Sequence, residues 1–168
     1  MIEIDVEGLE SVLEALTASS ESLIPSAAAG MKKGLGLVER DAKKLCPVVT
    51  GELRNSIQSK VDEYATFVNG EVGSHKEYVV YVEMGTGDVG RKSGGNGSPV
   101  KKAYRTGGWF VPVGRSEQMI ADTVVEAASN GFWTNGQPAR PFLWPAWKAN
   151  KGKVQAAVRN AVREGLHG

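Results

Sequence analysis

The stretch PSAAAGMKKGLGLVERDAKKLCPVVTGELRNSI, residues 25–57, decides the fold of this chain. Apolar side chains in its first part recur every three or four residues, which is the period of an amphipathic helix. These apolar positions are Ala28, Met31, Leu35, Val38, Ala42 and Leu45. Pro25 suits a first helical turn, and Pro47 ends the helix because the residue before a proline disfavours helical geometry. We therefore expect a helix at about 25–45, in which Gly30, Gly34 and Gly36 permit close approach of another backbone.

The segment that follows predicts a short helix and an antiparallel sheet. Thr50 is a good N-cap for one or two helical turns, which run into a strand at Ile57. Further strands are expected at about 65–72 and 109–113, in the same sheet as the first. Residues 78–84, YVVYVEM, have the composition of a strand, although so short a segment can equally form a helix.

Further elements are expected towards the two ends of the chain. Residues 2–6 alternate apolar and acidic side chains like a half-buried strand, and residues 9–16 have the period of a short amphipathic helix. Helices are also expected at 116–129 and 145–166. The sequence therefore predicts an α+β fold, in which the long N-terminal helix packs on a mainly antiparallel β-sheet and a helix ends the chain.

A Gly-rich, basic segment interrupts this pattern at about 87–108. It contains many glycines and cations and few residues that could join a core. An insertion of this length without its own structure is uncommon in a compact domain unless it has a function. We therefore expect a single domain, 1–168, with an inserted loop or arm at 87–108. Its central part, 91–105, is expected to be an assembly element.

Composition indicates an ordinary globular protein with unevenly placed charge. The formal net charge is +1, so the chain as a whole is no polyelectrolyte. The single cysteine cannot form an internal disulfide, the N-terminus lacks the basic start of a signal peptide, and no apolar run is long enough to cross a bilayer. Acidic residues dominate 1–24, whereas basic residues dominate 88–115 and 140–168. This asymmetry suits head-to-tail contacts between copies or a basic surface facing an anion, and solvated faces without a partner explain it equally well.

Neither a catalytic nor a metal-binding arrangement is recognisable in the sequence. Cys46 lies at the end of the apolar helix stripe with no base in a recognisable motif, so a buried small hydrophobe is its expected role. Gly85, Gly87 and Gly90 match G-x-G-x-x-G, but the following RKSGGNGSP is not expected to start the helix that a dinucleotide site requires. Glu83 stands alone, which favours a salt-bridge or capping role over catalysis. We therefore expect a non-enzymatic protein without cofactor or metal.

Three blocks of the sequence carry a family resemblance. CPVVTGELRNSI (46–57) is similar to an (A/C)-P-x-x-T-G-x-L-x-x-S-I block, YVVYVEMGTG (78–87) to a Y-x-x-Y-V-E-x-G-T block, and QPARPFLWPAW (137–147) to a P-A-R-P-F-L-x-P-A block. In this order they resemble the tail-component family of long-tailed bacteriophages, and the N-terminal IEIDVEGLESVLEAL fits the opening of that family. The interval 87–136 is long and basic here and varies in the family, so the resemblance implies no role for it. The resemblance implies an architectural role for Pro47, Thr50, Gly51, Leu53, Glu83, Gly85, Thr86, Arg140, Pro141 and Phe142.

Members of this family act as tail-completion or head–tail joining (neck) proteins. The resemblance therefore implies a non-enzymatic virion protein, made in the host cytoplasm, that forms a ring of six or twelve copies and contacts neighbouring neck and tail proteins. It also allows contact with genomic DNA passing through the lumen, and it implies no membrane partner. The alternative is a nucleic-acid-binding protein that uses residues 91–105. The candidate subunit or DNA contacts are Arg91, Lys92, Lys101, Lys102, Tyr104, Arg105 and Trp109.

Charged and aromatic residues predict how such a ring would close. Copies related by rotation meet through two different surfaces. The acidic surface expected to pair carries Glu3, Glu7, Glu10 and Glu14. Its basic counterpart is either the basic arm or the C-terminal helix, which carries Lys148, Lys151, Lys153 and Arg159. Because exposed ion pairs contribute only about 0–1 kcal/mol each, we expect apolar contacts from Trp109, Phe132 and Trp133 to supply most of the affinity.

Overall fold

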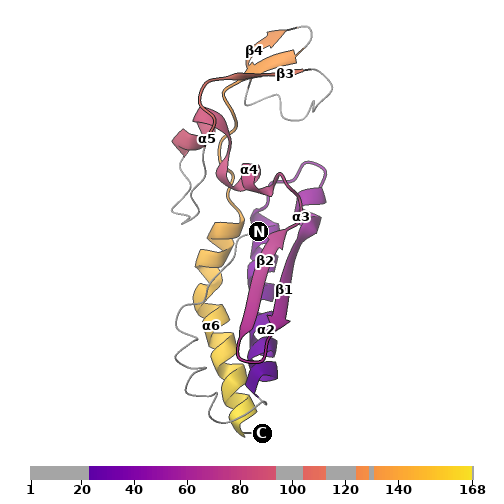
Figure 1. The fold of residues 1–168 in the computed structure, drawn as a ribbon, viewed down its shortest axis with the longest axis vertical. Coiled ribbons are helices and arrows are strands. Elements are labelled where there is room, and N and C mark those ends of the chain that lie inside the picture. Colours follow the sequence, from indigo (N-terminus) through magenta and orange to yellow (C-terminus); the bar gives the residue numbers. More distant parts are fainter. Residues whose placement is uncertain (1–22, 94–103, 113–123, 129–130, 168) are drawn as a thin grey trace.

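The computed structural model describes residues 23–93, 104–112, 124–128 and 131–167. These residues form an elongated molecule (Figure 1). Two long helices and a two-stranded hairpin make up one end, which we call the body, and a three-stranded sheet, the distal sheet, makes up the other. The short helices α4 (Val79–Met84) and α5 (Gly87–Ser93) lie between the body and the distal sheet.

Helix α2 (Leu23–Leu45) confirms the long helix expected from the apolar period. The predicted core positions Ala28, Met31, Leu35, Val38 and Ala42 are all buried. The prediction for Leu45 is wrong, because its side chain is 52% exposed. Cys46, whose N–H donates to the Ala42 carbonyl at 2.9 Å, ends the buried stripe instead and is 4% exposed.

Helix α6 (Leu143–His167) runs antiparallel to α2 and packs directly on it. The two backbones come close because α2 has glycine at the contacts. A Cβ on Gly30 would lie 2.7 Å from Val158 Cα, and one on Gly34 would lie 2.8 Å from Val154 Cα. Close approach was expected at Gly36 as well, but among the described residues nothing lies within 4 Å of a Cβ added there. The α2–α6 contact therefore depends on two of the three glycines.

The other side of α2 carries the hairpin. Strands β1 (Ile57–Glu63) and β2 (Val68–Ser74) pair antiparallel without a register shift. The second strand was expected at 65–72, so it begins three residues later than predicted. Gly70 sits against α2, where a Cβ would lie 2.6 Å from Leu35 Cδ1. The helix and the hairpin can pack this closely only because residue 70 has no side chain.

Helix α3 (Glu52–Ser56) joins the end of α2 to β1. Its N-cap is Gly51, with φ 83°, which has no side chain to accept a hydrogen bond. The prediction of Thr50 as N-cap is therefore wrong, although the Thr50 hydroxyl oxygen lies 3.4 Å from the Glu52 N–H. The left-handed conformation at Gly51 suits glycine and turns the chain so that Leu53, 7% exposed, enters the core.

The structure corrects two sequence interpretations between the body and the distal sheet. Residues 79–84 form helix α4, so the strand favoured at 78–84 is wrong and the helical alternative is right. The helical period places Val79 and Glu83 inside and leaves Val80 and Tyr81 exposed. Helix α5 begins at Gly87, where no helix was expected, but the element before the glycine pattern is a helix and not the strand that a dinucleotide site requires.

The distal sheet has the strand order β3-β5-β4, with antiparallel pairing throughout. The strands are β3 (Trp109–Pro112), β4 (Val124–Ala128) and β5 (Gly131–Thr134). The strand expected at 109–113 exists, but it does not join the hairpin sheet as predicted. The helix expected at 116–129 is wrong over 124–128, where β-branched Val124 and Val125 lie in a strand paired to β5.

The predicted strand at 2–6, the predicted helix at 9–16 and residues 116–123 lie outside the described residues. The α+β class is confirmed by two long helices combined with two small antiparallel sheets.

Candidate assembly site

The second and third sequence blocks meet at one carboxylate. Glu83, on α4, is 5% exposed and accepts three backbone N–H groups at the start of α6. Its Oε2 accepts from Phe142 (2.8 Å) and Leu143 (2.9 Å), and its Oε1 accepts from Trp144 (2.9 Å). A carboxylate at a helix N-terminus is stabilised by these donors and by the helix dipole. Glu83 therefore caps α6 from a distant part of the chain.

The prolines of the third block complete this cap. The first N–H groups of a helix lack partners within the helix. Pro141 and Pro145 have no N–H to satisfy, and the Arg140 N–H donates to the Val82 carbonyl at 2.8 Å. The Ala146 N–H reaches the Phe142 carbonyl at 3.4 Å. Every backbone donor from 140 to 146 thus has an acceptor, and Glu83 supplies the acceptors that the sequence RPFLWPA leaves open.

A second contact between the same two blocks lies next to the cap. The Thr86 N–H donates to the Gln137 carbonyl (2.9 Å), and the Thr86 Oγ1 accepts from the Gln137 N–H (3.0 Å). Gly85 precedes this pair with φ 72°, and a Cβ there would lie 2.6 Å from the Gln137 oxygen and 2.7 Å from the Ala139 nitrogen. Only glycine fits both the backbone angle and the space. Residues 79–93 and 134–144, which we call the junction, thereby connect the body to the distal sheet.

Some of the predicted contact residues are engaged at the junction. Arg91 forms an exposed ion pair with Asp88 at 2.9 Å, and the Tyr104 hydroxyl donates to the Met84 carbonyl at 2.9 Å. The Arg105 guanidinium carbon lies 5.5 Å from the centre of the Trp109 ring, a cation–π distance. Lys92 is exposed on α5. Lys101 and Lys102 lie outside the described residues. The structure brings Arg105 and Trp109 together and turns Arg91 and Tyr104 towards their own chain.

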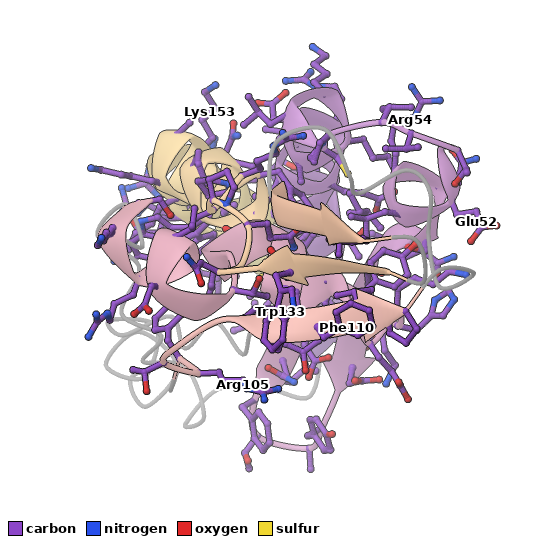
Figure 2. All side chains as sticks on the ribbon, turned by 90° about the horizontal axis from the view of Figure 1, so that it is seen from above. Glu52, Arg54, Arg105, Phe110, Trp133 and Lys153 are labelled. Atoms are coloured by element: carbon purple, nitrogen blue, oxygen red, sulfur yellow. The ribbon has the colours of Figure 1, made fainter. Side chains whose placement is uncertain are left out.

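The distal sheet exposes aromatic surface on one face. Phe110 and Trp133, opposite each other in β3 and β5, make an edge-to-face contact with ring centres 5.8 Å apart. Trp133 is 46% exposed, and Figure 2 shows the two rings side by side on the sheet. Of the three residues expected to make apolar subunit contacts, Phe132 is buried, because alternation along β5 turns it to the other face. That prediction is therefore wrong for Phe132.

Five large apolar side chains are exposed within the first two blocks, and the sequence interpretation missed them. They are Val48 (52% exposed), Val49 (69%), Tyr78 (42%), Val80 (40%) and Tyr81 (49%). Val48 and Val49 follow the end of α2, and the other three belong to α4 or the residue before it. We call these residues the apolar patch residues. The sequence indicated this exposure only through the two valines, which lie in a turn marked by proline and Thr-Gly.

The exposed side of α6 carries a row of cations. Lys148, Lys151, Arg159 and Arg163 are all exposed and follow one another at intervals compatible with one helix face. Lys153 is not part of this row, because its Nζ lies 3.3 Å from Oδ1 of the buried Asn150. Asn150 in turn donates to Asp41 on α2 at 2.9 Å. We call Lys148, Lys151, Arg159 and Arg163 the α6 basic row.

Cys46 has the surroundings of a core residue. Its Sγ lies 3.5 Å from the Pro47 carbonyl oxygen, and its side chain joins the hydrophobic core. Burial raises the pKa of the thiol, while the charge of Arg54 lowers it and that of Glu83 raises it. A thiol with a raised pKa is rarely ionised and is therefore a poor nucleophile.

In the part of the chain that the structure describes, no three His, Cys, Asp or Glu side chains gather as they would around a metal ion. None of the described helices has the length and apolar character needed to span a membrane.

Comparison with known proteins agrees with the sequence resemblance. Residues 10–85 match the family model HK97-gp10_like, whose description is "Bacteriophage HK97-gp10, putative tail-component". No curated protein and no solved structure matches the chain. The matched segment includes the 46–57 block, Glu83 and Gly85, whereas the third block lies beyond it and is joined to it through the Glu83 cap. Over residues 10–85 the chain is therefore similar to the HK97-gp10-like family of bacteriophage tail components.

Proposed function

We propose that the chain is a non-enzymatic structural subunit of the virion that closes into a ring and completes the tail or joins it to the head. The observation that carries the proposal is the exposure of Val48, Val49, Tyr78, Val80 and Tyr81. Exposed apolar side chains mark an interaction site where they are clustered, whereas single ones are ordinary, and we propose that these five lie on one interface. Here they lie within the first two of the three blocks that carry the family resemblance.

A ring needs a second, different surface on each copy, because a heterologous contact repeats around an axis. Two surfaces are suited to this role. The distal sheet offers Trp133 and Phe110 with Arg105, and aromatic and Arg side chains are enriched at protein interfaces. The α6 basic row offers charge that can set the register of the contact, and we propose that it faces Glu10 and Glu14 of the neighbouring copy.

The mass of the assembled species in solution tests this proposal. Val49→Glu combined with Val80→Glu places two charges among the apolar patch residues, and native mass spectrometry should show monomers where the unchanged protein shows closed rings. Gln58→Glu, at an exposed hairpin position, is the matched control and should leave the rings intact. Circular dichroism should confirm that each variant is folded. An unchanged protein that stays monomeric at all concentrations contradicts self-assembly.

A second experiment tests the role of charge. Replacing Lys148, Lys151 and Arg159 by Glu should slow assembly, and Glu10→Lys with Glu14→Lys should partly restore it. Failure of the rescue contradicts the acidic–basic pairing.

Duplex DNA binding distinguishes the alternative function. If a monomer binds DNA with a steep dependence on salt, and loses binding when Lys92 and Arg105 are replaced by Gln, the nucleic-acid role is favoured over the ring.

A further inference from the structure

A groove runs between α2 and the free edge of β1, away from the junction and from the α6 basic row. Its volume is about 450 Å³. The residues that line it are Pro25, Ala28, Ala29 and Lys32 from α2 and Ser59, Lys60, Val61 and Glu63 from β1. The walls are therefore mainly short apolar side chains on one side and a strand edge on the other.

Main-chain groups of β1 point into this groove. Successive residues of an antiparallel strand direct their N–H and C=O groups to opposite edges. The Ser59 N–H donates to Glu39 Oε2 at 2.8 Å, so it points away from β2. Val61 and Glu63, two and four residues further on, share that direction. In the described part of the chain, Glu39 is an acceptor for the first of these N–H groups, and the other two have none.

The side chains around this edge define what could pair with it. The strand face towards α2 carries Ile57 and Val61, whereas Lys60 lies exposed on the opposite face, where it pairs with Asp62 at 2.7 Å. A strand added here must place apolar residues next to Ala28 and Ala29 and polar residues on the opposite, exposed side, which carries the Lys60–Asp62 ion pair. Lys32, exposed on α2, adds a second cation beside the groove.

We propose that residues 2–6 of the same chain bind in this groove as a third strand on the edge of β1. The segment IEIDV has the required alternation, with Ile2, Ile4 and Val6 for the α2 side and Glu3 and Asp5 for the side of Lys60. A third strand would also cover an edge that could otherwise pair with other chains.

The segment can reach the groove of its own chain because the stretch that connects it to α2 is long enough. Residues 7–22 span up to about 50 Å when extended, and the groove begins at Pro25, next to the start of α2. A tethered strand has an effective concentration in about the millimolar range, so it outcompetes a neighbouring copy at micromolar concentration. This inference is drawn from the groove and does not depend on the proposed ring.

Amide hydrogen exchange of the full chain, resolved by NMR, tests the proposal. We expect the Val61 and Glu63 amides to exchange slowly in the unchanged protein. Ile2→Asp with Ile4→Asp should accelerate both at least about tenfold. Glu3→Gln with Asp5→Asn, which changes only the other side of the strand, should leave both protected. The Asp62 amide points towards β2 and reports in every variant whether the hairpin is intact.

Two results would overturn the inference. Fast exchange at Val61 and Glu63 in the unchanged protein would mean that the segment does not occupy the groove. Protection that rises with protein concentration over about a twentyfold range would mean that a neighbouring copy supplies the strand. Protection that is independent of concentration and lost only in the Ile2/Ile4 variant supports the proposal.

Discussion

Removing the charge of Glu83 should destabilise the whole chain, although the residue lies in a six-residue helix. Its carboxylate is 5% exposed and accepts three N–H groups at 2.8–2.9 Å. Glu83→Gln keeps one oxygen, which can still serve Phe142 and Leu143, but it turns an NH2 group towards the Trp144 N–H. It also removes the charge that favours the helix N-terminus.

The magnitude follows from the bonds that are lost. Hydrogen bonds to charged groups contribute about 1.5–3 kcal/mol, against about 0.5–1.5 kcal/mol for neutral ones. Losing one bond and weakening two should lower the free energy of unfolding by about 2–3 kcal/mol. Glu83→Ala leaves three N–H groups without an acceptor and should cost about 3–5 kcal/mol, a large part of a typical total of about 5–15 kcal/mol.

Equilibrium urea denaturation followed by circular dichroism measures this difference. Glu77→Gln is the matched control, because Glu77 is exposed just before α4, and it should change the free energy of unfolding by less than about 0.5 kcal/mol. If Glu83→Gln is as stable as the control, the cap contributes nothing and the account of the junction is wrong. If only the amides of 142–144 lose protection, the cap acts locally and does not stabilise the body.

Three further predictions concern the body. Gly34→Ala should destabilise by about 1–3 kcal/mol because its Cβ would meet Val154, whereas Gly36→Ala, whose Cβ would meet none of the described residues, should be neutral or stabilising by up to about 1 kcal/mol; urea denaturation compares the two. Cys46→Ala should cost about 1–2 kcal/mol and leave assembly intact, and loss of assembly in a folded variant would contradict the core role. Hydrogen bonds from Arg40 and Asn150 lower the pKa of Asp41 to about 2, so the stability it adds is present above the ordinary pKa near 4 and is lost as pH falls through about 2. The stability difference between the unchanged protein and Asp41→Asn should therefore shrink over that interval in acid denaturation, and a constant difference would refute the assignment.

The elements with a long and regular period were predictable from the sequence. In α2 and α6, apolar residues recur every three or four positions over several helical turns, and such a long pattern rarely arises by chance. The hairpin was also predictable, although its second strand starts at Val68. The helix α4 was not, because YVVYVEM has the composition of a strand and only tertiary contacts make it helical. The same limitation applies to β4, where a helix was expected.

The candidate site was predictable only in its individual residues. Glu83 suggested a cap or an ion pair, but its partners lie about sixty positions further along the chain, and no local pattern links them. Glycine is favoured at positions 51 and 85 because the backbone φ angles there are 83° and 72°. Neither angle can be predicted from the amino-acid composition. The exposed valines and tyrosines were missed for a related reason. Burial depends on which neighbour covers an apolar segment, and α4 is too short for its period to show which of its side chains are covered.

The cap explains why the second and third blocks belong together. A helix start leaves donors that some acceptor must satisfy when it is buried. The third block removes two of them by placing proline at 141 and 145, and the remaining three are within reach of one carboxylate with two oxygens. Glu83 would be a costly buried charge without RPFLWP, and RPFLWP would be a poorly satisfied helix start without Glu83. Because α4 leads into α5 and β5 leads into α6, this contact fixes the direction in which the distal sheet leaves the body (Figure 1). The proposed ring requires each subunit to present two surfaces at a constant angle to its neighbours, and the contact between the two blocks would provide that fixed connection.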